Sequence, residues 1–184
     1  MIISDSEVIQ NCLNGDAVAF EILVERYKKL IYTTAYRMLG NKEEAEDVSQ
    51  EAFIRIYGSL NRYNPEFKFS TWAMKITTNL CLDQLRKRKS FVLPMDELPE
   101  VVDDDKTPEE NYISEETGRE VQLAISKLPE KYRNFLVLFH VQNLSYQEII
   151  EITGESLTIV KNRLYRARQM LKEILLENGK GASI

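Results

Sequence analysis

Basic side chains are concentrated in one short stretch, GESLTIVKNRLYRARQMLKEIL, which runs from Gly154 to Leu175. Within it, residues 161–172 hold five Lys or Arg and no Asp or Glu. The chain as a whole is acidic, with 29 Asp and Glu against 24 Lys and Arg and a formal net charge of −5. Because guanidinium and ammonium groups bind phosphate oxygens, a basic segment in an acidic chain indicates a polyanionic ligand.

The same stretch has the two-sided pattern of a helix that packs on a core. Its apolar stripe recurs at spacings of three and four and consists of Leu157, Val160, Leu164, Ala167, Leu171 and Ile174. The opposite arc of the helical wheel carries Thr158, Lys161, Asn162, Tyr165, Arg166 and Gln169, and the flanks carry Arg163 and Arg168. In a major groove, this arc would reach base edges and the flanks would reach phosphates. The alternative is a solvated basic helix.

The residues before this helix have the signals of a helix-turn-helix. Ser145 and Glu148 form an S-x-x-E capping box, which starts a short helix. Gly154 suits the end of that helix, and Ser156 suits the N-cap of the next one. Together, the capping box, the glycine turn and the two-sided helix favour duplex DNA binding over the solvated-helix alternative.

A second basic stretch, FKFSTWAMKITTNLCLDQLRKRKS, covers residues 67–90 and contains six Lys or Arg. Trp72, Lys75, Asn79 and Arg86 form a stripe along its expected helix. An aromatic ring, a cation and an amide suit unstacked bases and a single-stranded backbone. The alternative is that Trp72 belongs to the core and the other residues to an ordinary surface.

Hydrophobic periodicity is helical along nearly the whole chain, without an alternating strand pattern. The expected helices cover about residues 5–14, 16–38, 42–60, 69–88, 114–127, 129–142, 145–153 and 157–176. Residues 96–110 hold eight acidic residues, one Lys and two Pro, without an amphipathic period. The sequence therefore predicts an all-α protein with two small helical domains, at 1–92 and 114–184, joined by a flexible acidic linker at 93–113.

Residues that would carry catalysis or metal binding are scarce. The chain has two cysteines, Cys12 and Cys81, and one histidine, His140, without metal-ligand spacing, and we expect all three to be structural. A nucleophilic triad and a glycine-rich phosphate loop are also missing from the sequence, so we expect no catalytic site, cofactor or metal. No apolar run is long enough for a membrane span, and the first residues lack a signal-peptide pattern, which predicts a cytoplasmic protein.

Three segments, in this order along the chain, resemble the extracytoplasmic-function (group 4) family of bacterial RNA polymerase σ factors. AFEILVERYKKLIYTTAYRMLGNKEEAEDVSQEAFIRIY (19–57) resembles regions 2.1 and 2.2, and KFSTWAMKITTNLCLDQLRKRK (68–89) resembles regions 2.3 and 2.4. LPEKYRNFLVLFHVQNLSYQEIIEITGESLTIVKNRLYRARQML (128–171) resembles region 4. The resemblance implies a non-enzymatic subunit that binds core RNA polymerase and the −10 and −35 promoter elements, and that helps to open the −10 duplex. It also implies control by an anti-σ factor, often a membrane-anchored one.

The resemblance and the helix patterns together assign residues to these tasks, and the positions that match the family's own are Asp47, Gln50, Glu51, Asn79, Lys161, Asn162, Tyr165 and Arg166. Docking on the polymerase β′ coiled coil would use Glu44, Asp47, Gln50 and Glu51, whose acidic members lie beside an apolar face of Ala45, Val48, Ala52 and Ile56. Binding of −10 DNA would use Lys68, Trp72, Lys75, Asn79 and Arg86, with Asn79 helping to capture a flipped base that the loop Asn61–Ser70 receives. Binding of −35 DNA would use Thr158, Lys161, Asn162, Arg163, Tyr165, Arg166 and Arg168.

The helix-turn-helix departs from the family's frequent GISVGTVKSRLHRAR, notably at Glu155, Thr158, Ile159 and Asn162, so no promoter sequence is transferred. Two other functions stay open at this point. A stand-alone helix-turn-helix regulator would explain residues 145–175 but would leave the patterns at 43–57 and 67–90 unused. An enzyme acting on nucleic acid would need clustered carboxylates around Mg²⁺, whereas the acidic cluster of this chain lies in the expected linker.

Overall fold

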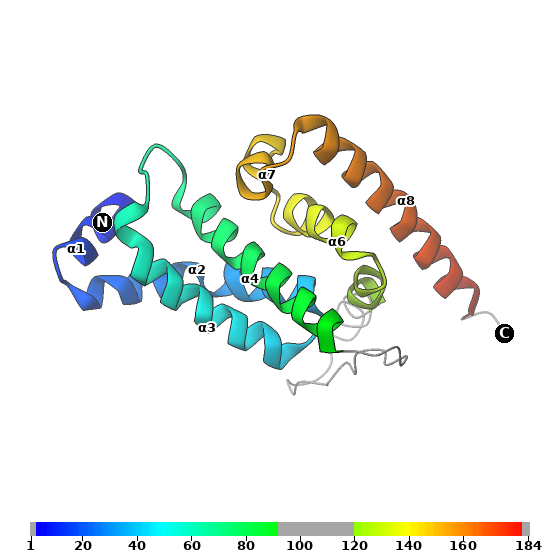
Figure 1. The fold of residues 1–184 in the computed structure, drawn as a ribbon, viewed down its shortest axis with the longest axis horizontal. Coiled ribbons are helices and arrows are strands. Elements are labelled where there is room, and N and C mark those ends of the chain that lie inside the picture. The colour runs from blue at the N-terminus through cyan, green and yellow to red at the C-terminus, as the bar shows by residue number, and fades with distance from the viewer. Residues whose placement is uncertain (1–2, 92–119, 182–184) are drawn as a thin grey trace, which may run out of the picture.

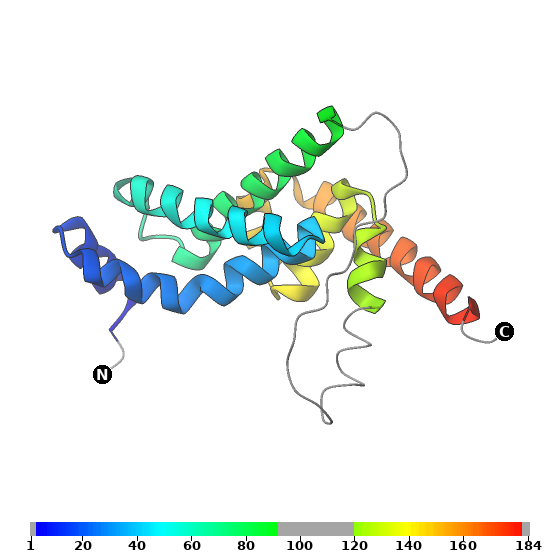
Figure 2. The same cartoon turned by 90° about the horizontal axis from the view of Figure 1, so that it is seen from below.

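The computed structural model describes residues 3–91 and 120–181, which form helices and connecting turns without a strand (Figures 1 and 2). The all-α prediction is therefore confirmed for these two ranges. The linker expected at 93–113 lies outside the described residues. The helix expected at 114–127 is described from residue 120 onwards and is helical to residue 126.

The first helical domain consists of α1 (Asp5–Leu13), α2 (Ala17–Leu39), α3 (Lys42–Ser59) and α4 (Phe69–Phe91), with the 3₁₀ turn η1 (Leu60–Arg62) after α3. Side chains cap the starts of α1, α2 and α3, because Ser4, Asp16 and Asn41 each accept a backbone N–H bond there. The apolar face predicted for α3 is buried against α2 and α4. This packing turns the opposite side of α3 outward.

The second helical domain contains the helical residues 120–126, α6 (Glu130–Leu136), α7 (Tyr146–Thr153) and α8 (Leu157–Gly181). The helix expected at 129–142 is α6 followed by a π-helical turn, η2 (Val137–Val141). Pro129 precedes α6 as its N-cap, where the absence of an N–H group costs no helical hydrogen bond. Figure 1 shows α8 running along the outside of α6 and extending beyond the other helices.

The two helical domains pack against each other, with α7 beside α4 and with α2 touching α6 and η2. Met74 of α4 is completely buried in a cluster whose other members include Phe135 and Ile149 of the second domain. Arg133 of α6 donates to the Met38 carbonyl near the end of α2 at 2.7 Å. Apolar burial and the satisfaction of helix-end carbonyls therefore both hold the domains together.

Candidate nucleic-acid interface

The helix-turn-helix has the caps that the sequence predicts. The Ser145 side chain accepts from the Glu148 backbone, and Glu148 accepts from the Ser145 backbone at 2.9 Å. Gly154 ends α7 in the left-handed region, with a φ of 71°, which an L side chain adopts only under strain. The Ser156 hydroxyl accepts from the Ile159 N–H at the start of α8. These caps fix the turn that places α8 against α6 and α7.

The predicted outward arc of α8 is exposed. Its exposed members are Thr158, Lys161, Asn162, Tyr165, Arg166 and Gln169. Val160, Leu164 and Ala167 are buried on the opposite side, as predicted. Leu157 does not belong to the buried stripe: it is 43% exposed, because it is the first residue of α8 and lies outside the core clusters.

The two flanking arginines of α8 have different surroundings. Arg168 is exposed, donates from Nε to His140 Nε2 at 2.9 Å, and lies over the Phe139 ring. Arg163 is half-buried, pairs with Glu155 at 2.9 Å and lies over the ring of Phe135. Arg163 is thus held within its own domain, whereas Arg168 is held at the surface. Burial and the charge of Arg168 lower the pKa of His140, which favours the neutral, accepting imidazole.

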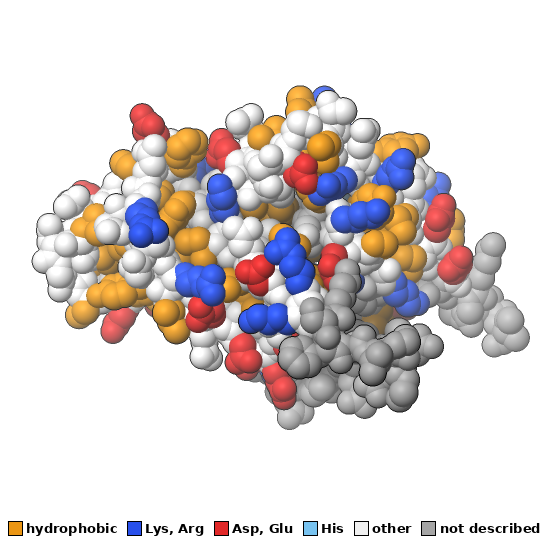
Figure 3. All heavy atoms as spheres, in the orientation of Figure 1, with side chains coloured by type: hydrophobic (Ala, Val, Ile, Leu, Met, Phe, Trp, Pro, Cys, Tyr) orange, Lys and Arg blue, Asp and Glu red, His pale blue; other side chains and the backbone are white. Residues whose placement is uncertain are grey.

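Two members of the outward arc, Arg166 and Lys161, lie against side chains of α6 and α7. Arg166 lies beside Tyr132 of α6, and its guanidinium lowers the pKa of that phenol. The ammonium of Lys161 lies 5.8 Å from the centre of the Tyr146 ring. Figure 3 shows Lys and Arg side chains along the face that carries α4 and α8, mixed with acidic ones. The face is therefore a set of local basic sites rather than one continuous positive surface.

Three residues of the predicted −10 stripe, Lys75, Asn79 and Arg86, are exposed on α4. Arg86 also pairs with Asp83 at 2.9 Å. Trp72 is half-buried and packs against Tyr63 and Phe69, with ring centres 5.5 and 5.7 Å away. The ring of Trp72 thus packs on the core with part of it accessible, and its contact with a base stays a prediction.

Lys68, the remaining residue of this set, is bound by the second domain. Its ammonium lies 2.8 Å from a carboxylate oxygen of Glu148 in α7. The bond to Lys68, together with the Ser145 backbone bond, lowers the pKa of Glu148 to about 2. Glu148 therefore caps α7 and also joins the two domains, a double role that the capping-box pattern did not indicate.

The docking residues expected on α3 lie beside its buried face. Asp47 and Gln50 are exposed. Glu51 pairs with Arg55 one turn along the same helix at 2.7 Å, and Glu44 pairs with Arg88 of α4. Asp47 is consequently the acidic member of this set with the clearest access to a partner, while Glu44 helps to join α3 to α4.

The described residues offer neither a metal site nor a membrane span. Within 3–91 and 120–181, no group of three or more His, Cys, Asp or Glu is placed to hold a metal ion. Cys12 and Cys81 are free and buried, as expected, and burial raises the pKa of the Cys81 thiol to about 12. Among these residues, every helix is too short or too polar to cross a membrane.

A capped helix-turn-helix with a basic second helix, packed against the first helical domain, defines an all-α DNA-binding protein. The Sigma-70 region 2 family model matches residues 23–91, and the Sigma-70, region 4 model matches residues 118–171. The chain is 40% identical over 176 residues to ECF RNA polymerase sigma factor SigW of Bacillus subtilis, covering 91% of this chain and 94% of that protein. It is 37% identical to ECF RNA polymerase sigma factor SigE of Mycolicibacterium smegmatis, covering 89% of this chain and 65% of that protein.

Solved structures show the same fold. The sigma factor RpoE of Bartonella quintana, solved with the anti-sigma factor NepR, superposes with a TM-score of 0.66 at 19% identity, over 85% of this chain and 96% of that one. The chain belongs to the ECF (extracytoplasmic-function) family of RNA polymerase sigma factors.

Proposed function

We propose that this protein binds core RNA polymerase and directs it to promoters that carry particular −10 and −35 elements. The observation that carries the proposal is the presence, in one chain of this family, of an exposed basic arc on α8 and an exposed Lys75–Asn79 stripe on α4. A stand-alone regulator would use only the first of these surfaces. We therefore favour the σ-factor function over the regulator.

The −35 element would be bound by α8. Lys161, Asn162 and Arg166 are exposed on the arc that a major groove would face, so they are proposed to read base edges. Thr158 and Tyr165 complete this arc. Arg168 is proposed to bind phosphate, because His140 and Phe139 hold its guanidinium beside the arc. Arg163 would contribute least, since it is already paired with Glu155.

The −10 element would be bound, as a separated strand, by α4 and the loop before it. Asn79 is proposed to hydrogen-bond an unstacked base, and Lys75 and Arg86 to bind the backbone. Trp72 has one side in the core, so it would offer a base only its accessible side. Lys68 would join them only after it leaves Glu148.

Binding of both elements requires the two domains to separate. The −10 and −35 elements lie roughly 80 Å apart along B-DNA, at 3.4 Å per base pair. In the present arrangement α7 packs on α4, so both surfaces lie on one compact unit. We propose that this closed arrangement, defined by α7 packed on α4, is the free form and that binding to the polymerase opens it.

Docking on the polymerase would use the exposed side of α3. Asp47 and Gln50 are proposed to contact a basic coiled coil of the β′ subunit, and Glu51 would exchange its Arg55 partner for a basic residue there.

An anti-σ factor is proposed as a further partner, because a related fold has been solved in complex with one. We propose no enzymatic role, and we propose a cytoplasmic location because an initiation subunit must reach the polymerase and the promoter.

Co-migration with core polymerase tests this function directly. The purified chain should elute with core polymerase on a sizing column, and the Asp47→Lys variant should elute mainly free. A matched control is Asp83→Lys, which reverses an exposed charge on α4 instead of α3. If the unaltered chain elutes free while still binding duplex DNA, it is a stand-alone regulator instead.

A further inference from the structure

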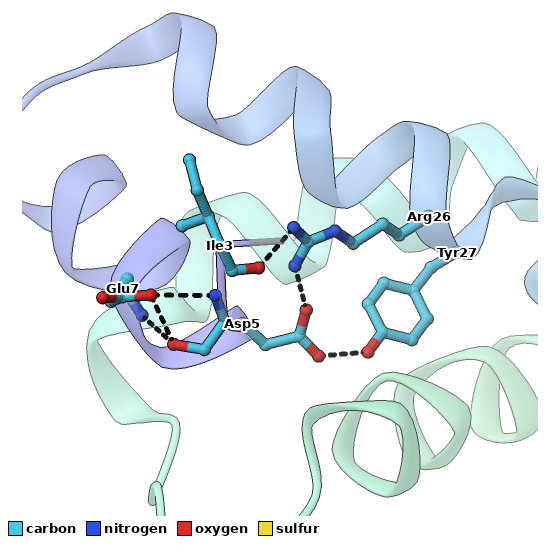
Figure 4. Close-up of polar contacts among 6 residues, drawn as sticks. Ile3, Asp5, Glu7, Arg26 and Tyr27 are labelled. Atoms are coloured by element: carbon cyan, nitrogen blue, oxygen red, sulfur yellow. Dashed lines mark hydrogen bonds and ion pairs between the residues drawn. The ribbon is translucent and has the colours of Figure 1, made fainter. Parts of the chain in front are cut away.

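Asp5 accepts hydrogen bonds from two neighbouring side chains of α2 (Figure 4). Arg26 Nη1 donates to Asp5 Oδ1 at 2.6 Å, and the Tyr27 hydroxyl donates to Oδ2. The other terminal nitrogen of Arg26 donates to the Ile3 carbonyl at 2.6 Å. Asp5 also lies in the first turn of α1, where a negative charge is favoured by the helix dipole. The start of α1 is thus attached to the middle of α2.

Tyr27 extends this attachment to the loop before α4. Its ring centre lies 5.1 Å from that of Phe69, which in turn lies 5.5 Å from that of Tyr63. The Tyr63 hydroxyl donates to the Phe67 carbonyl at 2.6 Å and so closes the loop. Trp72 packs on both Tyr63 and Phe69. The aromatic rings therefore form a continuous path from Tyr27 to the start of the −10 stripe.

The pKa values of Tyr27 and Tyr63 support the same connection between α1 and the loop before α4. Burial, followed by the hydrogen bond to Asp5, raises the pKa of Tyr27 far above that of a free phenol. The Tyr27 hydroxyl therefore stays protonated and remains a donor at any working pH. Burial also raises the pKa of Tyr63, and the charge of Asp5 adds to this effect. The negative charge of Asp5 therefore acts on Tyr63, in the loop before α4.

A simple anchor for α1 would not need Tyr27. Arg26 already bonds both Asp5 and the Ile3 carbonyl, and Val8 and Ile9 of α1 are buried in the core that α1 shares with α2. The Tyr27 hydroxyl adds a bond that fixes the position of a ring in contact with Phe69. Because Phe69 is the first residue of α4, a displaced Tyr27 ring would displace the start of that helix.

We propose that Asp5 and Tyr27 are positioning residues for the −10 site. They hold Phe69, and through it Tyr63 and Trp72, so that an unstacked base meets an ordered aromatic surface. An ordered site loses less side-chain freedom on binding and holds a base in one orientation, so a base that fits is favoured over one that does not. The proposal rests on the proposed function, in particular on the assignment of Asn79 and the loop 61–70 to −10 DNA.

Three substitutions separate positioning from anchoring. Tyr27→Phe removes one hydroxyl and keeps the ring, and Asp5→Asn keeps the size of the side chain but removes its charge. Arg26→Gln is the matched control, because it removes the charged part of the anchor while leaving the bond between Tyr27 and Asp5. The probes are single-stranded oligonucleotides with the −10 sequence that the unaltered holoenzyme selects from a promoter library, together with single-base variants of that sequence.

Trp72 is the only tryptophan of the chain, so its fluorescence reports on this site in the free protein and on oligonucleotide binding. Tyr27→Phe and Asp5→Asn should shift its emission and lower the preference for the selected oligonucleotide about three- to tenfold, the value of one net hydrogen bond. Arg26→Gln should lower the unfolding temperature and change the preference less than about twofold. Open-complex formation by the reconstituted holoenzyme should follow the same order.

Two results would overturn the positioning role. One is an unchanged preference in Tyr27→Phe and Asp5→Asn, and the other is an equal loss in Arg26→Gln, which would indicate an anchor only. Asn79→Ala distinguishes this failure from that of the proposed function. If Asn79→Ala lowers the preference while Tyr27→Phe does not, only the positioning role fails. If Asn79→Ala has no effect either, the −10 assignment itself is wrong.

Discussion

The ion pair between Lys68 and Glu148 joins the two domains, and removing its charge should favour their separation. Glu148→Gln is the suitable change, because Gln also completes a capping box and Ser145 should keep its partner. Lys68 stays in place for DNA binding. The substitution therefore weakens the closed arrangement without removing either the cap of α7 or a proposed −10 contact.

The size of the effect follows from the exposure of the pair. The Lys68 side chain is 74% exposed and that of Glu148 is 17% exposed, so solvent screens much of the attraction. Pairs of this kind contribute about 0.2–1 kcal/mol, which corresponds to an increase in the ratio of open to closed protein of about 1.4- to 5-fold. Met74 and its apolar neighbours hold the rest of the interface, so Glu148→Gln should not open the chain completely.

The pH dependence has a definite sign. The pKa of Glu148 is lowered from 4.5 to about 2 when the protein is folded and closed. The stabilisation of the closed arrangement by the Lys68–Glu148 pair should be complete above about pH 4.5. It should be lost as the pH falls toward 2 and Glu148 becomes protonated. Because Glu148 stays ionised between pH 5 and 8, titration of this pair should not change the open fraction in that range, and salt rather than pH should weaken the pair.

Energy transfer between dyes on α3 and α8 would measure the open fraction, with cysteines introduced at the exposed positions Glu46 and Lys172. Glu7→Gln is the matched control, since Glu7 completes the capping box of α1 with Ser4. Glu148→Gln should raise the open fraction and the affinity for single-stranded −10 DNA, and Glu7→Gln should change neither. Equal effects of the two substitutions would refute a role of the Lys68–Glu148 pair in closure.

Four further substitutions have expected outcomes. Asp47→Lys should weaken binding to core polymerase about tenfold or more, measured by sizing or titration, because it places like charges at a complementary interface; normal affinity would remove the docking assignment. Asn79→Ala should slow promoter opening, and the defect should persist on a template pre-melted at −10 if Asn79 reads a base; full activity on duplex would exclude both roles. Arg166→Ala should flatten the preference among −35 duplexes, with roughly 1–3 kcal/mol of discrimination lost. Arg168→Ala should weaken all duplexes alike and lower the salt slope by about one, and identical behaviour of the two variants would reduce α8 to an electrostatic anchor.

Local signals in the sequence predicted local structure well. The capping box of Ser145, the left-handed Gly154 and the buried stripe through Val160 and Leu164 are all present, because each depends on residues within one or two helical turns. Leu157 was wrongly assigned to the buried stripe, since periodicity does not indicate where the neighbouring core ends.

Contacts between distant residues were not predicted. The sequence marked Lys68 as a DNA contact and Glu148 as a cap, but their pairing depends on how α7 packs against α4. The same holds for Arg133, which binds the Met38 carbonyl across the domain interface, and for His140, whose acceptor role toward Arg168 has no signal in its neighbours along the chain. The linker at 93–113 and the roles of the individual DNA-binding residues stay predictions.

Run-off transcription from a promoter library tests the central claim most directly. Purified core polymerase should give specific transcripts only when this chain is added, from templates that share two elements at a fixed separation. Altering either element of one such template should abolish its transcript, while core binding by the chain stays unchanged. Transcripts that do not depend on the chain, or chain-dependent transcripts from templates without shared elements, would contradict a promoter-recognition function for α4 and α8.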